Sequence, residues 1–459
     1  MVIIARFRIF SKQNLQIMLS KKAKNEAQTS LFFGLVDTLN PQHELYKLAN
    51  KINWEVFEDS FKSKYSEKWS RPAKPIRLMC GLLILKHLRN LSDESVVLQW
   101  TENAYYQYFC GENEFQTTPP CTPSELVHFR KRIGESGMEV ILKESIRVND
   151  DHTDEDNHKM AFIDSTVQEK NVTYPTDAKL HKKIIKKCWN IIRDKGLKIR
   201  QSYTRTLKDL CRDQRFRNHP KNRQKALRAD RKMRTIAGRL VRELQRLLPT
   251  NNEYLEFFGL ADKILSQKKG TKKKVYSLHE PEVQCISKGK EHKKYEFGNK
   301  VSIIRSVTGI IIGAKSFRNE YDGHTISDAL AQVKRISGKD VEKLAGDRGY
   351  RGQKIVGNTE ILIPGVPQKK DSRYQKKKKH DLFCKRAGIE PTIGHLKSDY
   401  RLGRNFYKGL QGDAINVILA AAAYNFKRAM KVLLLLLKTI LGSVKMCFEI
   451  RFPENKLAF

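Results

Sequence analysis

The stretch Phe383-Cys-Lys-Arg386-Ala-Gly-Ile-Glu390-Pro-Thr-Ile-Gly-His-Leu-Lys397 places one carboxylate among several cations. On a helix, positions three, seven and fourteen residues beyond Phe383 fall within an arc of roughly 60°. Arg386, Glu390 and Lys397 are therefore predicted to share one face. A carboxylate flanked by two cations can hold a metal ion while the cations bind phosphate oxygens.

A plainer interpretation of the same stretch stays open. An exposed helix with intrahelical ion pairs would carry the same residues, and such pairs are common on helix surfaces. Gly388 weakens a helix, and Pro391 removes a hydrogen bond unless a helix begins or kinks there. The stretch by itself does not decide between the two interpretations, so the rest of the chain must.

The charge of the chain indicates its class of partner. The 459 residues carry a formal net charge of +38 and have an isoelectric point near 9.8. This length predicts two or three folded units. A balance this basic favours a polyanionic partner, above all a nucleic acid.

Membrane and disulfide classes are not favoured. The run Met1–Ala5 meets Arg6 too soon for the core of a signal peptide. The apolar run Val432–Leu437 lies between two lysines and is too short to span a bilayer. Eight cysteines occur without a C-x-x-C pair, which indicates neither a zinc site nor a disulfide scaffold. We therefore expect a soluble cytoplasmic protein without a membrane partner.

Helices dominate the sequence before residue 150. An apolar helix is predicted over 75–91, and a second one begins after Ser92. Thr122-Pro-Ser-Glu125 is a capping box with proline at the first helical position, and it predicts a helix through Arg132. That helix ends in three basic residues, Arg130, Lys131 and Arg132. A DNA-contacting bundle of helix-turn-helix type and a helical domain with solvated cations are about equally compatible with this pattern.

A basic helical segment follows a short strand. The strand is predicted over 160–167 and contains Asp164 near its end. Residues 170–250 hold 25 Lys and Arg against six Asp and Glu, a net charge of +19. One apolar stripe and one basic surface are predicted on the helix 231–248. The stripe is Ile236, Leu240, Leu244 and Leu247, and the basic surface is Arg234, Arg239, Arg242 and Arg246. Duplex DNA phosphates are the partner that fits this surface.

Strands return towards the C-terminus and bring a second aspartate. A hairpin is predicted over 300–314, followed by the helix 327–336, the strand 341–345 that precedes Asp347, and the strand 360–363. Lys376–Lys379 is predicted to be a basic loop, and residues 414–428 a helix packed on the sheet.

This order predicts a mixed sheet with helices on its faces, in which three carboxylates converge. Asp164 and Asp347 each follow a central strand, at the end where α/β sheets build their sites. The later helix brings Glu390 across that edge. Three such oxygen donors suit Mg²⁺, and two ions can activate the attacking oxygen and stabilise the leaving one in phosphodiester displacement.

The order and the local motifs resemble the DDE transposases of bacterial insertion sequences, most closely the insertion sequence five family. That family's signature, Y-x2-R-x3-E-x6-K, stands here as Phe383-x2-Arg386-x3-Glu390-x6-Lys397, with phenylalanine in place of tyrosine. The resemblance covers residues 70 to 430. Further matching segments are Phe162–Glu169, Leu344–Tyr350, Tyr174–Asp177 and Tyr321–His324.

The resemblance implies an α/β, ribonuclease-H-like catalytic core with a helical N-terminal domain and a basic helical insertion. Asp164, Asp347 and Glu390 would be the catalytic metal ligands for two Mg²⁺ ions, for which Mn²⁺ can substitute. Arg386 and Lys397, with the ring of Phe383, would position the phosphates of the transposon ends. The insertion would clamp double-stranded DNA, the N-terminal helices would read the terminal inverted repeats, and a homodimer would act in the bacterial cytoplasm at the nucleoid.

The expected segments are a lead-in (1–70), a helical DNA-binding domain (71–150), a discontinuous catalytic domain (151–169 and 275–430), the insertion (170–274) and a tail (431–459). The expected function is metal-dependent DNA cleavage and strand transfer in cut-and-paste transposition. Two alternatives remain: a non-catalytic DNA-binding relic of a transposase, and a metal-dependent nuclease that cuts without joining.

Overall fold

A computed structural model describes residues 34–65, 72–149, 154–249, 252–268, 270–287, 294–318, 320–363, 365 and 368–451. The first half of the expected lead-in and the last residues of the expected tail lie outside this set. The chain divides into two compact units. One comprises Met1–Thr166, Val301–Gly403 and Ala414–Phe459, and the other comprises Val167–Lys300 and Arg404–Asp413.

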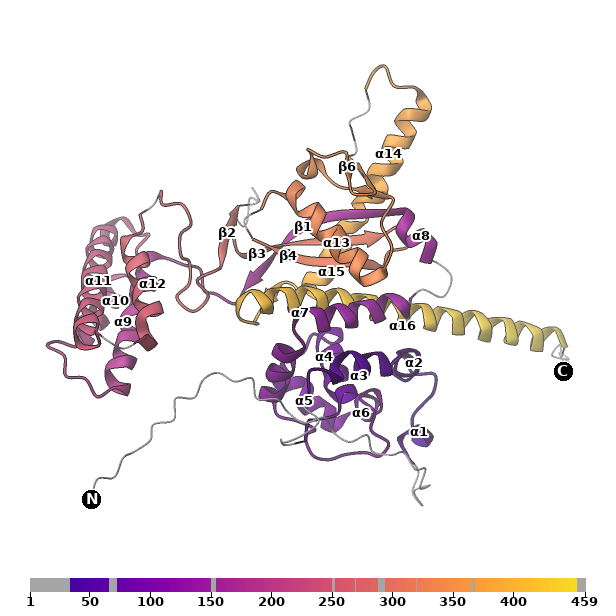
Figure 1. Cartoon of the computed structure of the whole chain (residues 1–459), viewed down its shortest axis with the longest axis horizontal. Coiled ribbons are helices and arrows are strands. Elements are labelled where there is room, and N and C mark those ends of the chain that lie inside the picture. Colours follow the sequence, from indigo (N-terminus) through magenta and orange to yellow (C-terminus); the bar gives the residue numbers. More distant parts are fainter. Residues whose placement is uncertain are drawn as a thin grey trace, which may run out of the picture. The chain divides into compact units, whose positions relative to one another are not determined.

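The N-terminal part of the first unit is all helical (Figure 1). The apolar sequence of α4 leaves it no polar face, and every residue except Arg77 is buried. It is the central helix of this part, and the shorter helices contribute their apolar faces to the same core. The helices are α1 (Leu35–Thr38), α2 (Glu44–Lys51), α3 (Glu55–Lys62), α4 (Ile76–Leu88), α5 (Asp93–Glu102), α6 (Ala104–Phe109) and α7 (Pro123–Arg147).

Helix α7 begins at the predicted capping box and continues beyond the predicted end. The Thr122 amide donates to Glu125 Oε2 at 2.7 Å, and the Glu125 amide donates to Thr122 Oγ1 at 3.4 Å. Gly134 has φ 64° inside the helix, which kinks the chain there. The predicted end at Arg132 therefore corresponds to the first segment of a kinked helix.

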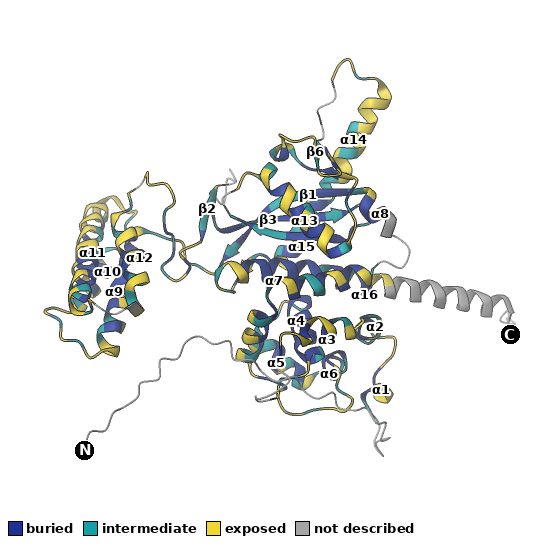
Figure 2. Ribbon diagram, in the orientation of Figure 1, coloured by how far each residue is buried: buried dark blue, intermediate teal, exposed yellow. Residues whose placement is uncertain are grey.

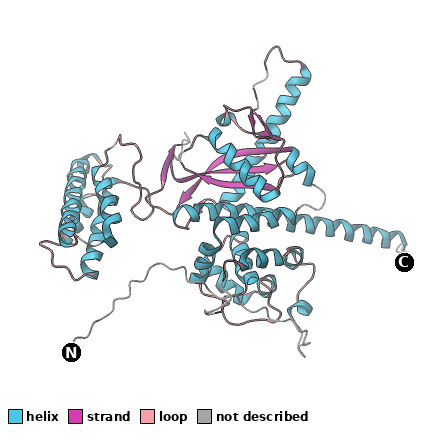
Figure 3. Cartoon of the chain, in the orientation of Figure 1, coloured by secondary structure: helices cyan, strands magenta, loops and turns pink. Residues whose placement is uncertain are grey.

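The other part of the first unit, its sheet part, is a mixed sheet with helices on its faces (Figure 3), as the sequence predicted. Parallel pairs join β1 to β5 and β5 to β7, while β6 is antiparallel to β7. Strand β3 pairs with both β1 and β4. The strands are β1 (Met160–Lys170), β3 (Tyr295–Ser306), β4 (Ile311–Phe317), β5 (Lys343–Ala345), β6 (Ile355–Val356) and β7 (Thr359–Leu362).

Helix α16 (Gly409–Arg451) lies between this sheet and the N-terminal helices (Figure 1). Its Asn425 side chain accepts from the Ile311 amide at 2.9 Å and donates to the Ile311 carbonyl at 2.8 Å. The Asn425 side-chain amide also donates to Ser145 Oγ of α7 at 3.1 Å. One buried polar side chain thus joins three elements. The predicted helix 414–428 lies within this longer helix, and most of its residues are buried.

Other helices of this unit are α8 (Asp154–Lys159), α13 (Ile326–Ser337), α14 (Arg373–Ala387) and α15 (Ile389–Ser398). The prediction of a basic loop over Lys376–Lys379 was wrong, because these residues lie within α14. Ser372 and Gln375 cap that helix reciprocally, with hydrogen bonds of 3.0 and 3.2 Å. None of the fifteen residues of α14 is buried (Figure 2). The predicted single face from Phe383 to Lys397 is divided between two helices at Gly388.

The second unit contains the predicted basic helical insertion, with an apolar core of its own. Its helices are α9 (Asp177–Asp194), α10 (Thr204–Asp213), α11 (Pro220–Leu247) and α12 (Leu255–Ser266). Three residues of the predicted stripe, Ile236, Leu240 and Leu244, are buried in that core. Leu247, at the end of α11, is 43% exposed, so the stripe was wrong at that residue. Strand β2 (Gln284–Ser287) pairs with the start of β3, and β8 (Arg404–Asn405) pairs with the end of β1.

Candidate active site

Two aspartates, Asp164 and Asp347, come shortly after residues that pair with each other on neighbouring parallel strands. Phe162 of β1 lies opposite Ala345 of β5. Two residues further along each chain come Asp164, which is still within β1, and Asp347, which lies two residues beyond the end of β5. Side chains two residues apart on a strand project from the same face. Asp164 therefore belongs to the face of the sheet on which Phe162 lies, and Asp347 begins the turn that follows the neighbouring strand.

Short backbone hydrogen bonds orient the two carboxylates. Asp164 Oδ1 accepts from the Ser165 amide at 2.7 Å. Asp347 Oδ1 accepts from the Gly349 amide at 2.8 Å and so caps the short 3₁₀ helix η3 (Arg348–Tyr350). The Asp-Arg-Gly-Tyr sequence folds this way because an aspartate readily accepts from a backbone amide two residues later.

A third aspartate adjoins this pair, and its role was not predicted. A Cβ atom at Gly349 would lie 2.9 Å from Asp347 Oδ1 and 3.4 Å from Asp322 Oδ2, so the two carboxylates flank the same glycine. Burial raises the pKa of the Tyr350 hydroxyl, and the charges of Asp322, Asp164 and Asp347 raise it further. The signal in the sequence was the Tyr321–His324 segment, which the family resemblance included without a role for its aspartate.

Helix α15 brings Glu390 to this face through a shared apolar cluster. Ile389 is buried against Phe162 and Ala345. Partly buried residues from several elements complete the cluster, namely Met160, Leu362, Leu382 and Ile393. Each of its three buried residues thus lies one or two positions before a predicted catalytic carboxylate.

The Glu390 carboxylate does not form a metal-binding cluster with the aspartates among the described residues. Its Oε1 accepts from Arg386 Nη2 at 3.2 Å, and the Glu390 side chain is 61% exposed. Among the described residues, no three His, Cys, Asp or Glu side chains lie close enough to hold a metal ion together. The donor chemistry nevertheless suits a hard divalent cation, because all the nearby acidic groups are carboxylates.

The two cations of the signature lie at different ends of this region, Arg386 beside the junction between α14 and α15 and Lys397 in the last turn of α15. The Arg386 guanidinium lies 5.7 Å from the centroid of the Phe383 ring, and that ring is 54% exposed. Lys397 lies near the end of α15, where its carbonyl accepts from the Gly403 amide at 3.2 Å. Arg386, Phe383 and Lys397 thus lie on the two helices that carry Glu390, with Arg386 in direct contact with it.

The three basic residues predicted on α7 have different environments. Arg130 is buried and forms two hydrogen bonds with the Asp93 carboxylate, at 2.6 and 2.8 Å. This placement favours a structural role and gives no support to a DNA contact by Arg130. Lys131 is exposed. The Arg132 guanidinium lies 4.8 Å from the centroid of the Tyr65 ring.

The predicted arginines of the insertion lie on its solvent side. Arg239 and Arg242 are both exposed on α11, whose opposite side supplies Leu240 and Val241 to the core. Their guanidinium groups are therefore available to a partner from solvent.

Comparison with known families identifies the class of this chain. Residues 269–426 match the family described as Transposase DDE domain, and residues 34–132 match Transposase domain (DUF772). The chain therefore belongs to the DDE transposases, whose members are nucleases and transposases with a ribonuclease-H-like core and in general use divalent metal ions. The resemblance to DDE transposases stated from the sequence is thus confirmed.

A curated relative extends the comparison. The chain is 37% identical over 187 residues to "Uncharacterized protein ORF8 in nfe locus" of Rhizobium meliloti, an alignment that covers 40% of this chain and 90% of the relative. No solved structure was found to match the chain. Within the described residues, no helix has the length and apolar character needed to cross a membrane.

Proposed function

We propose that this DDE transposase binds the terminal inverted repeats of an insertion sequence and catalyses metal-dependent cleavage and strand transfer. One observation carries the proposal. Phe162, Ala345 and Ile389 pack together from three segments that are far apart in the chain, and Asp164, Asp347 and Glu390 follow them. Core packing therefore brings the neighbourhoods of all three carboxylates to one face of the sheet.

Asp164, Asp347 and Glu390 would hold the metal, two Mg²⁺ ions or Mn²⁺ in their place. When bound, such ions activate an attacking oxygen and stabilise the leaving one. The backbone hydrogen bonds to Asp164 and Asp347 keep both carboxylates oriented before any cation arrives. Glu390 would complete the ligand set by leaving its ion pair with Arg386 and binding the metal instead. The Glu390 side chain is largely exposed, so this ion pair contributes little stability.

Basic residues of several elements would hold the DNA. Arg386 and Lys397 would position phosphates beside the carboxylates, and the exposed Phe383 ring would stack or pack there. Arg239 and Arg242 of the insertion would clamp the duplex. The N-terminal helices would read the repeats, with Lys131 and Arg132 as contacts. We further propose that the protein works as a homodimer on paired ends, in the cytoplasm at the nucleoid.

Two other functions are compatible with particular residues. A DNA-binding relic would explain why phenylalanine stands at position 383 in place of the signature tyrosine. The presence of Asp164, Asp347 and Glu390 together argues against it. A nuclease that cuts without joining would use the same carboxylates, and only an assay of strand transfer separates it from a transposase.

The decisive experiment is cleavage and strand transfer with Mg²⁺ on DNA that carries the element's own ends. Glu390→Gln removes one charge at nearly constant size, so binding of the ends should persist while both reactions are lost. Glu360→Gln is the matched control, because Glu360 lies exposed on β7 and pairs only loosely with Lys343, at 3.9 Å. If the wild type binds the ends specifically but does not cleave them, the protein is a DNA-binding relic and not an enzyme. If it cleaves without joining, it is a nuclease.

A further inference from the structure

Two arginines of the sheet part of the first unit face each other across a glycine. Arg305 lies on β3 and Arg428 on α16. A Cβ atom at Gly309 would lie 3.1 Å from Arg305 Nη2 and 3.2 Å from Arg428 Nη1. Gly309 itself has φ +96°, a conformation that suits glycine and leaves the space between the guanidinium groups free of a side chain.

Neither guanidinium has an acidic partner among the described residues. The Nε atom of Arg305 is buried and has no hydrogen-bond partner in that part of the chain. Burial lowers the pKa of Arg305; Tyr424 opposes this effect and the positive charge of Arg428 adds to it. Two like charges held together in a half-buried place are unfavourable until an anion joins them.

Arg305 lies on the face of the sheet that carries Asp164. The Val307 amide donates to the Met160 carbonyl at 3.2 Å, and the antiparallel ladder continued from this bond sets Arg305 opposite Phe162. On its other side, Arg305 Nη1 would lie 3.1 Å from a Cβ atom at Gly388. Arg305 therefore adjoins the junction between α14 and α15, two residues before Glu390.

We propose that Arg305 and Arg428 form a binding site for one backbone phosphate of the DNA at the catalytic face. Guanidinium groups present paired N–H donors that match the oxygens of a phosphate group. The site would bind a phosphodiester anion. The proposal rests on the proposed function only in assigning that anion to the DNA backbone. Arg305 and Arg428 are substrate-positioning residues in this assignment, because they hold DNA and take no part in the bond changes.

The test measures affinity for the duplex ends as salt concentration is varied. Arg305→Gln and Arg428→Gln should each weaken binding about tenfold, because each removes a charge-assisted contact. Since both arginines hold one phosphate, the double variant should bind little more weakly than either single variant. The slope of log affinity against log salt concentration should fall by only about 0.9 for the double variant, the value expected for the loss of one phosphate contact.

Arg335→Gln is the matched control. Arg335 belongs to the same unit but already has a carboxylate partner, Glu139, at 2.8 Å. Arg305→Lys and Gly388→Ala are two further variants that keep the charge, and both should weaken binding. Lysine loses the planar donors of arginine. An alanine at 388 would push against the Arg305 guanidinium.

Thermal unfolding of each variant identifies any change that comes from loss of folding. If Arg305→Gln fails to fold, Arg428→Gln tests the site alone, because Arg428 lies half-buried on the helix surface. Unchanged affinity and salt slope in the folded variants would overturn the phosphate site. If the wild type still cleaves DNA, that result would leave the proposed function intact. If the wild type does not cleave but the arginine variants bind DNA more weakly, the enzymatic function would be wrong and the phosphate site would stand.

Discussion

Arg386 Nη2 lies 3.2 Å from Glu390 Oε1, across the glycine that separates α14 from α15. The contact joins the last turn of one helix to the first turn of the next. Only 11% of the Arg386 side chain is exposed, whereas 61% of the Glu390 side chain is. The arginine is thus the fixed partner, and the carboxylate is the group with room to move. A cation bound by Asp164 and Asp347 would compete with Arg386 for Glu390.

Arg386→Gln should therefore separate metal binding from DNA binding. Release of Glu390, the exposed member of this ion pair, should raise Mn²⁺ affinity by up to about fivefold. Loss of a charged phosphate contact should lower affinity for the transposon ends about tenfold. Titration of Mn²⁺ by electron paramagnetic resonance and anisotropy of labelled duplex measure the two effects. Arg335→Gln is the control, because Arg335 already pairs with Glu139 at 2.8 Å. A fall in the Mn²⁺ affinity of Arg386→Gln would show that Arg386 supports the metal site instead of competing with it.

Phe383→Tyr should strengthen binding of the transposon ends. The ring is 54% exposed beside Arg386, so an added hydroxyl would reach solvent or DNA without disturbing a core. One new hydrogen bond to a phosphate should raise affinity about two- to tenfold. The unfolding temperature should stay unchanged. Equal affinity for the two proteins would mean that this hydroxyl is not a DNA contact in the present chain.

The position of Asp347 could be predicted because it follows a short apolar strand, and strand ends meet at one edge of a parallel sheet. Asp164 lies within β1, which continues to Lys170 and so beyond its predicted end at residue 167. The helix around Lys376–Lys379 was missed because it has no apolar face, so hydrophobic periodicity gave no signal. The burial of Arg130 depends on Asp93, 37 residues earlier, and a sequence pattern does not reveal such a pairing. The proximity of Asp322 to Asp347 likewise arises from the folding together of two loops.

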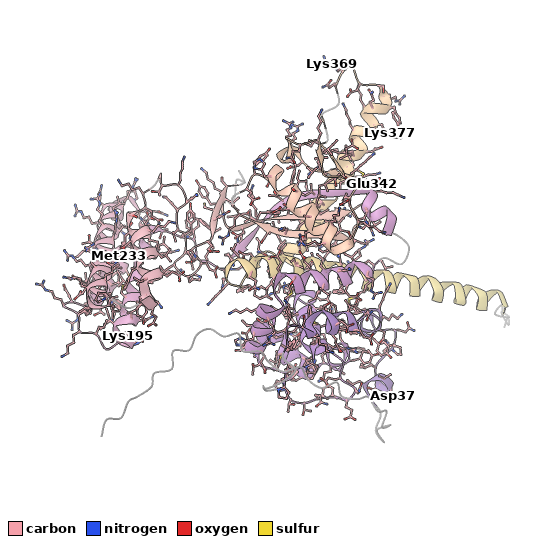
Figure 4. The ribbon with its side chains drawn as sticks, viewed as in Figure 1. Asp37, Lys195, Met233, Glu342, Lys369 and Lys377 are labelled. Atoms are coloured by element: carbon pink, nitrogen blue, oxygen red, sulfur yellow. The ribbon has the colours of Figure 1, made fainter. Side chains whose placement is uncertain are left out.

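Neutralisation of α14 should weaken DNA binding without sequence preference. Its basic residues surround a helix with no buried side, and Lys377, marked in Figure 4, is one of them. Lys377→Gln combined with Lys378→Gln should lower the salt slope by up to about 1.8, the value for two phosphates. Affinity for specific and unrelated duplexes should fall in parallel.

The control for α14 is Lys334→Gln combined with Arg335→Gln, which removes the same charge from α13. Both of these residues have carboxylate partners, Asp340 and Glu139. If the control changes the salt slope as much as the α14 variant does, the effect comes from overall charge and not from a DNA contact on α14.

Lys86 should make the stability of the N-terminal helices increase with pH above neutrality. Burial lowers its pKa from 10.5 to about 8, although Asp93 at 2.8 Å opposes the shift, and the charges of Arg130 and Arg401 add to it. Between pH 8 and 10.5 the unfolded chain then holds more protons than the folded one, so the free energy of unfolding rises with pH, by up to about 3 kcal/mol. Lys86→Met removes this contribution, whereas Lys62→Met, an exposed lysine, keeps it. Urea unfolding at pH 7.5 and 9.5 compares the three proteins, and a difference between wild type and Lys86→Met that stays constant with pH would contradict the lowered pKa.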